Sequence, residues 1–110
     1  MKIDIYQVPY KVTMQNFLPI EQRIPVTIDK VGYIELEFFD RDECWHLGNW
    51  TAWADEKPSN LYYEGRSFSV CEALYNPETD TYHLAVTLGW KEFKTLEEII
   101  SYFENKIGII

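Results

Sequence analysis

Residues 67–90 read SFSVCEALYNPETDTYHLAVTLGW and contain two β-rich runs separated by Asn76-Pro-Glu-Thr-Asp80. Pro77 suits the second position of a type I turn, so this stretch predicts a β-hairpin with strands in 67–75 and 81–90. A register with an even number of residues between paired positions matches residues of similar character across the two strands. It pairs Tyr75 with Tyr82, Ala73 with Leu84, and Cys71 with Val86. We expect this face of the hairpin to join the hydrophobic core, because register fixes which face is apolar.

The C-terminal region predicts an amphipathic helix over 95–107. Thr95-Leu-Glu-Glu98 has the pattern of a capping box, which marks a helix N-terminus. Apolar residues then follow at helical spacing: Leu96, Ile99, Ile100, Phe103 and Ile107. Gly108 suits the end of the helix, and the apolar stripe should pack on one face of a sheet.

The N-terminal half predicts further strands. Apolar residues alternate with other residues in 24–28 and 34–38, which indicates a second hairpin. A three-residue loop, Lys30-Val31-Gly32, gives this hairpin one apolar face by pairing Ile28 with Ile34, Val26 with Leu36, and Ile24 with Phe38. Residues 3–8 and 10–14 are β-leaning segments that Pro9 interrupts.

The order of these elements predicts the fold class. Strands come first and one helix comes last, which is typical of an α+β fold. We expect a mainly antiparallel sheet built from hairpins, with the C-terminal amphipathic helix packed on one face. A chain of 110 residues suits a single domain, 1–110. Residues 40–66 are predicted to form a long aromatic and acidic loop or insert, with a short strand near 50–54 as the alternative.

The segment 40–64 holds three of the four tryptophans and six carboxylate residues. One interpretation buries the indoles as pins that hold this segment on the sheet. The other leaves at least one ring exposed among acids, which suits a partner rich in Lys or Arg. The candidate partner-binding residues are Trp45, Trp50, Trp53, Asp40, Asp42, Glu43, Asp55 and Glu56.

No residue spacing indicates catalysis, a metal site or a cofactor. The cysteines and histidines have the composition of a zinc site but a poor spacing: Cys44, His46, Cys71 and His83. The predicted hairpin sends Cys71 and His83 to opposite faces of the sheet. Glu35 and Glu37 share a strand face that we expect to point toward water. We therefore expect a protein that is not an enzyme and that binds no metal or cofactor.

The net charge of −8 argues against direct contact with nucleic acid or an anionic membrane, where Lys and Arg must neutralise phosphates. The charge can also serve solubility alone, and that alternative stays open. Residues 1–6 lack the apolar core of a signal peptide, and no run is long and apolar enough to predict a membrane span. We expect a cytoplasmic protein with reduced thiols.

The leading functional hypothesis is a nonenzymatic, acidic protein-binding domain that occupies a basic surface of a larger protein. In composition the chain resembles the small acidic inhibitors encoded by phages and mobile elements, anti-CRISPR proteins and nucleic-acid mimics among them, although no family motif carries this resemblance. Two alternatives stay open. One is a small-ligand or glycan-binding module that uses the tryptophans, and the other is a structural subunit that self-associates through Phe39, Trp90 or Ile109-Ile110.

Overall fold

The computed structural model describes residues 1–108, with the side chains of Asn16, Phe17, Ile20 and residues 106–108 outside the description. The strands are β1 (Lys2–Gln7), β2 (Asp29–Glu35), β3 (Leu61–Tyr63), β4 (Glu72–Asn76), β5 (Thr81–Val86) and β6 (Gly89–Phe93). The α-helices are α1 (Tyr10–Thr13), α2 (Arg41–Gly48) and α3 (Leu96–Gly108). Short 3-10 turns are η1 (Met14–Phe17), η2 (Ile20–Gln22) and η3 (Trp50–Ala52).

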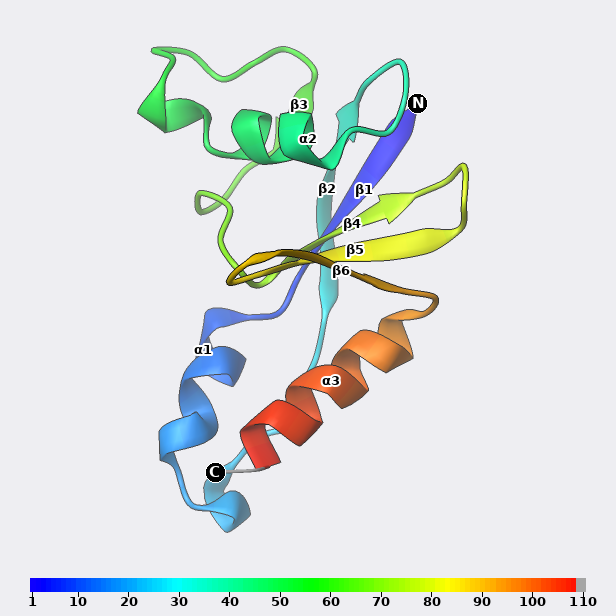
Figure 1. Ribbon diagram of the computed structural model, residues 1–110. Helices are drawn as coiled ribbons and strands as arrows, with labels where there is room; N and C mark the ends of the chain where they lie inside the picture. The colour runs from blue at the N-terminus through cyan, green and yellow to red at the C-terminus, as the bar shows by residue number, and fades with distance from the viewer. Residues whose placement is uncertain (109–110) are drawn as a thin grey trace.

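The six strands form one sheet in the order β3-β2-β1-β4-β5-β6, and every pair of neighbours is antiparallel. Figure 1 shows α2 on one side of this sheet and α1 and α3 on the other. The α+β class, the antiparallel sheet and the C-terminal helix on one face are therefore confirmed. None of the helices within residues 1–108 is long and apolar enough to cross a membrane.

Each face of the sheet has its own hydrophobic core, because side chains alternate between faces along a strand. The first core lies between the sheet and α2 and consists of Ile3, Ile5, Ile34, Cys44, Leu47, Leu61, Tyr63, Phe68 and Leu74. The second core lies under α1 and α3 and consists of Val8, Val12, Val26, Ala73, Leu84, Ile99 and Phe103.

The predicted register of the β4–β5 hairpin is confirmed for two of its pairs. Tyr75 lies opposite Tyr82, and Ala73 lies opposite Leu84. Ala73 and Leu84 belong to the second core, as the alternation requires. The predicted first strand is too long, because β4 begins only at Glu72.

The prediction of one strand over 81–90 is wrong. Thr87 and Leu88 form a turn, so the run divides into β5 and β6, and Val86 pairs with Gly89. Val86 therefore lies at the end of the β5–β6 hairpin, and Cys71 precedes β4 in a turn. Both side chains still pack against the second core, although they are not strand partners.

The predicted hairpin of 24–28 with 34–38 is wrong. Strand β2 runs straight through the proposed loop 30–32 and pairs with β1, which places Ile34 opposite Ile3 and Gly32 opposite Ile5. Gly32 serves a close approach instead of a turn, because a Cβ there would collide with the backbone carbonyl of Tyr62 in β3.

Residues 24–28 lie outside the strands, and the backbone of Ile24 bonds to a side chain instead of a neighbouring strand. The Gln15 side chain donates to the Ile24 carbonyl at 2.8 Å and accepts from the Ile24 N–H at 2.6 Å. The predicted β-leaning segment 10–14 is also wrong, since it contains α1. Val12 and Thr13 donate their N–H groups to the carbonyl of Pro9, which starts this helical turn.

The segment 40–66 is not a long loop, and no strand forms at 50–54. It contains α2, η3 and β3. Asp40 caps α2, because its Oδ1 accepts the Glu43 N–H at 3.0 Å. Phe39 directly precedes this cap, and Cys44 follows it by four positions. Both residues pack against the first core, which is the arrangement of a hydrophobic staple.

The C-terminal helix forms as predicted, with bounds shifted by one residue. The Glu98 N–H donates to Thr95 Oγ1 at 3.1 Å, and the Glu98 carboxylate accepts the Lys94 N–H at 3.0 Å. Ile99 and Phe103 are buried in the second core. The side chain of Ile107 and the predicted Ile109-Ile110 contact lie outside the described residues.

Candidate partner-binding surface

The first turn of α2 separates two hollows on the protein surface. The Phe38 hollow has a volume of about 230 Å³ and is lined by Leu36, Glu37, Phe38, Asp40 and Glu43. The Phe38 side chain is 63% exposed, although it is a large apolar residue. Its lining side chains include three carboxylates and no Lys, Arg or His, and the N-terminal ammonium of Met1 donates to the Leu36 carbonyl at 2.6 Å.

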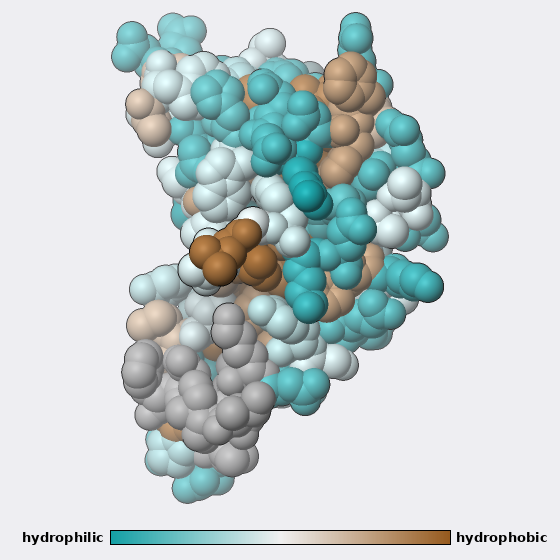
Figure 2. All heavy atoms as spheres, in the orientation of Figure 1, coloured by the Kyte–Doolittle hydropathy of each residue, from teal (hydrophilic) through white to brown (hydrophobic). Residues whose placement is uncertain are grey.

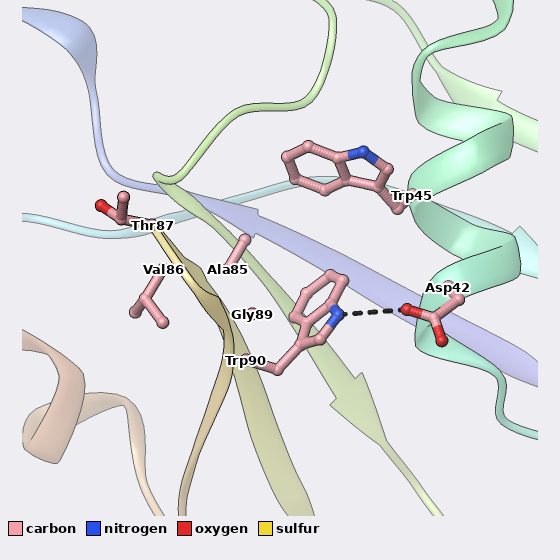
Figure 3. A pocket seen from close by; sticks show the side chains of 7 residues that line it. All are labelled: Asp42, Trp45, Ala85, Val86, Thr87, Gly89 and Trp90. Carbon is pink, nitrogen blue, oxygen red and sulfur yellow. Dashed lines mark hydrogen bonds between the residues drawn. The ribbon is translucent and has the colours of Figure 1, made fainter.

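The tryptophan groove lies on the other side of this turn, between α2 and the β5–β6 hairpin (Figure 3). It has a volume of about 260 Å³ and is lined by Asp42, Trp45, Ala85, Val86, Thr87, Gly89 and Trp90. The indoles of Trp45 and Trp90 meet edge to face, with centroids 5.9 Å apart and ring planes at 88°. Trp90 Nε1 lies 3.4 Å from Asp42 Oδ1, to which it donates a long hydrogen bond.

Phe68 supports Trp45, the residue of α2 that lines the groove. The rings of Trp45 and Phe68 meet edge to face at 6.4 Å, and Phe68 in turn packs against Tyr63 at 5.5 Å. Gly48 allows this approach, because a Cβ on Gly48 would collide with the Phe68 ring. The end of α2 therefore lies directly on the β3–β4 connection.

A buried polar network holds that connection in place. The Glu72 side chain is fully buried and accepts from Gln7 Nε2 at 2.8 Å, Arg66 Nε at 3.2 Å and the Ser69 N–H at 2.6 Å. The Ser69 hydroxyl adds a fourth contact at 3.2 Å. Arg66 also donates to the Val8 carbonyl at 3.0 Å. This network surrounds the carboxylate with donors and fixes the segment that carries Phe68.

A second polar cluster ties α2 to β5 and β6 through His83. Arg41 Nη1 donates to His83 Nδ1 at 3.1 Å, and His83 Nε2 lies 3.2 Å from Thr81 Oγ1. Burial lowers the pKa of His83, and the neighbouring Arg41 lowers it further, whereas Glu92 raises it. The neutral imidazole fits these contacts, because Nδ1 must accept from a guanidinium.

The predicted site residues do not form one cluster. Asp40 and Glu43 line the Phe38 hollow, and Asp42 and Trp45 line the tryptophan groove. Trp45 and Trp50 are both partly buried against the first core, as the pin interpretation expects of these two residues.

The rest of the predicted set lies beyond the C-terminal end of α2. Trp53 is 47% exposed and stacks on His46 with centroids 4.2 Å apart, and its Nε1 donates to the His46 carbonyl at 2.8 Å. Asp55 and Glu56 follow it as exposed residues that line neither hollow. Four of the eight predicted residues thus line the two hollows, Trp50 packs against the first core, and the remaining three lie apart.

Two aromatic residues of this surface were not predicted to belong to it. The sequence pattern places Phe38 in a core-facing strand and Trp90 at the end of a long strand. For Phe38 the available signal was Asp40-Arg-Asp-Glu43, whose cap pattern ends any strand before residue 40. For Trp90 the sequence near α2 offered no signal, because the contact joins distant parts of the chain.

The two thiols differ in their surroundings. Burial raises the pKa of Cys44 to about 12, with Asp40 and Glu43 adding to the effect. Burial also raises the pKa of Cys71, which is only partly covered. Cys71 packs against the second core and His83 lies on the opposite face of the sheet, so the two are separated as expected, although Cys71 lies in a turn before β4 and not in the predicted strand. Among the described residues, no group of three or more His, Cys, Asp or Glu side chains is placed to hold a metal ion.

The surface around the hollows combines apolar and polar areas. Figure 2 shows brown, hydrophobic surface at the β5–β6 turn beside teal, hydrophilic surface over α2. Leu88 at this turn is 97% exposed. A paler brown area covers the loop between β2 and α2, the loop that carries Phe38.

Comparison with protein-family models, curated proteins and solved structures finds no match to this chain.

Proposed function

We propose that this protein is a nonenzymatic binding domain that docks onto a basic surface of a larger protein. Its contact surface consists of the Phe38 hollow, the first turn of α2 and the tryptophan groove. The finer form of the proposal is an inhibitor that fills a basic surface or channel meant for nucleic acid, as phage and mobile-element inhibitors or nucleic-acid mimics do. In this proposal the protein acts in the cytoplasm, where its thiols stay reduced.

The observation that carries the proposal is an exposed phenyl ring in a hollow that three carboxylates line. Asp40 and Glu43 also stabilise α2, because acids are favourable at a helix N-terminus. Glu37 lies outside the helix, so helix stabilisation does not account for its place in the Phe38 hollow. An apolar anchor beside three carboxylates suits a partner that presents Lys or Arg next to an apolar contact.

The tryptophan groove supports a second candidate, a small-ligand or glycan-binding module. Two indoles converge in a hollow of about 260 Å³, and aromatic rings are common in ligand pockets. The self-association hypothesis receives less support, because Phe39 and Trp90 are both partly buried against the first core. Partly buried rings leave less apolar area for a subunit contact.

The proposal is tested by affinity capture from a lysate of the source across a salt series. Phe38→Ala removes the exposed anchor and should leave the fold intact, because 63% of this residue is in water. Tyr62→Ala is the matched control, since Tyr62 is 49% exposed and points away from α2, between the buried residues of β3. We expect capture to weaken with salt and to fail for Phe38→Ala alone.

Capture that does not change with salt would contradict the electrostatic part of the proposal. Equal capture by Phe38→Ala and the wild-type protein would contradict the anchor. For the second candidate, tryptophan fluorescence is measured across a panel of sugars and metabolites. A saturable change in that panel would favour the ligand-binding module, and an unchanged spectrum would exclude it.

A further inference from the structure

We propose that the tryptophan groove is a binding site for an alkylammonium group, presented by a lysine side chain of the partner or by its methylated form. Asp42, Trp45 and Trp90 form the site, and the β5–β6 turn closes its far side (Figure 3). The inference rests on the proposed function, because it names the group that the basic partner places in this groove.

The two indoles provide the surface that a cation needs. The face of an aromatic ring carries partial negative charge, and tryptophan binds cations more strongly than the other aromatic residues. The planes of Trp45 and Trp90 are almost perpendicular, so together they form a corner. A compact, rounded group such as an ammonium contacts both walls of a corner, whereas a sugar ring stacks best on one flat face.

Trp90 already interacts with a cation within the protein. The guanidinium carbon of Arg41 lies 5.8 Å from the centroid of the Trp90 ring. Arg41 does not line the groove, and its Nη1 lies 3.8 Å from Glu92 Oε1. Arg41 therefore does not supply the positive charge that the groove lacks.

Asp42 supplies the negative charge of the site. Its carboxylate stands at the wall of the groove, and its Oδ1 accepts from Trp90 Nε1. That indole N–H is neutral, and no Lys, Arg or His within the described residues forms an ion pair with Asp42. A carboxylate beside two indoles and without a cationic partner complements an ammonium group in charge.

The size of the groove favours a side chain over a whole cofactor. Its volume of about 260 Å³ lies just below the range of roughly 300–1,000 Å³ that is common for small-molecule pockets. An ammonium group with its adjoining methylenes fits into this space, and the methylenes can pack against the apolar parts of the rings. The remainder of the partner would then lie over the first turn of α2.

The test is a titration of the full chain observed through the indole N–H signals in ¹⁵N–¹H NMR spectra. The four signals are assigned with single Trp→Phe variants. The probes are Nα-acetyl-lysine methylamide, its Nζ-trimethyl form, Nα-acetyl-arginine methylamide, choline, and 3,3-dimethylbutan-1-ol. 3,3-Dimethylbutan-1-ol has the shape of choline without its charge. Comparison of these two probes therefore separates the contribution of the charge from that of apolar contact.

We expect choline and at least one lysine probe to shift the Trp45 and Trp90 signals in a saturable manner. The neutral analogue should bind about tenfold more weakly or worse, because it lacks the cation–π and carboxylate contacts. A stronger response to the trimethyl form would assign the methylated side chain, and a stronger response to unmodified lysine would assign the free amine. Equal shifts with choline and its neutral analogue would overturn the proposal, as would preference for arginine.

A matched pair of variants tests the role of the carboxylate. Asp42→Asn removes the charge from the groove, and Asp55→Asn makes the same change at an exposed position outside it. Asp42→Asn should weaken choline binding about tenfold, and Asp55→Asn should leave it unchanged. Equal affinities of the two variants would overturn the assignment of Asp42.

This experiment fails separately from the proposed function. If the ammonium probes do not bind but Phe38→Ala still abolishes salt-dependent capture, the proposed function stands and the ammonium site is refuted. If the probes bind at the groove but capture does not depend on salt or on Phe38, the site stands and the proposed docking function is refuted.

Discussion

The buried carboxylate of Glu72 offers a quantitative test of how the surface is positioned. Its side chain is fully buried and is contacted by four donors from Gln7, Arg66 and Ser69. Glu72→Ala would leave the Arg66 guanidinium and the Ser69 N–H without this acceptor. Removal of one member of a buried ion pair costs about 3–5 kcal/mol. Domains of this size have a free energy of unfolding of about 5–15 kcal/mol, so the loss is a large fraction.

The assay is urea unfolding followed by circular dichroism, with Glu72→Ala, Glu72→Gln and Glu64→Gln. The first variant should lower the midpoint by about 1.5 M or more, given an m-value of about 1–2 kcal/mol/M. Glu72→Gln should lose about 1–3 kcal/mol, because an amide keeps one accepting oxygen. Glu64→Gln is the control, since that carboxylate pairs with Lys57 and is 87% exposed, and exposed pairs contribute little. Similar midpoints for Glu72→Ala and Glu64→Gln would refute the role assigned to the network.

Three further predictions follow from single contacts. Gly48→Ala should cost about 1–3 kcal/mol and shift the Trp45 indole signal, because the new methyl group collides with Phe68; an unchanged melting temperature would contradict this packing. Stability should be constant above about pH 6.5 and fall as the pH drops through that value toward the lowered pKa of His83, because the unfolded chain then binds the proton more tightly. His83→Gln should flatten this dependence in thermal melts between pH 5 and 7, and an unaltered profile would exclude His83 as its source. A thiol reagent should modify Cys71 well before Cys44, since Cys44 is fully buried and its pKa is raised to about 12; faster loss of Cys44 in peptide mass spectra would contradict this order.

The parts of the fold that the sequence predicts correctly depend on neighbouring residues. The β4–β5 register follows from the turn at Pro77 and from the alternation on both sides of it. Helix α3 follows from Thr95 and Glu98, whose side chains make the expected cap contacts. In both cases the determining interactions lie within a few residues of the element, so local pattern suffices.

The errors arise where a distant segment competes with a local one. The pattern in 24–38 allows a hairpin, but β1 offers β2 a longer apolar partner through Ile3 and Ile5. Helix α2 buries only Cys44, Leu47 and Gly48, so its apolar periodicity is weak and its cap was the stronger signal.

The candidate site has the same division. Acids and indoles of the central segment were identifiable, because they share a short stretch of sequence. Their separation into two hollows was not identifiable from the sequence. Phe38 forms a wall of one hollow, and Trp90 forms a wall of the other. Asp42 and Trp90 are 48 positions apart, and no local pattern links them. The groove could be predicted only from the strand order in the sheet, because that order brings the β5–β6 hairpin next to α2.

The most direct test of the central claim is the dissociation constant of the captured partner as a function of salt for two charge variants. One variant combines Glu37→Gln, Asp40→Asn and Glu43→Gln, in which Asn preserves the helix cap. The other combines Asp55→Asn, Glu56→Gln and Glu64→Gln and changes the net charge equally. We predict weaker binding and a shallower salt dependence for the first variant alone. Equal losses in both variants would contradict a localised acidic contact surface and would leave net charge as the cause.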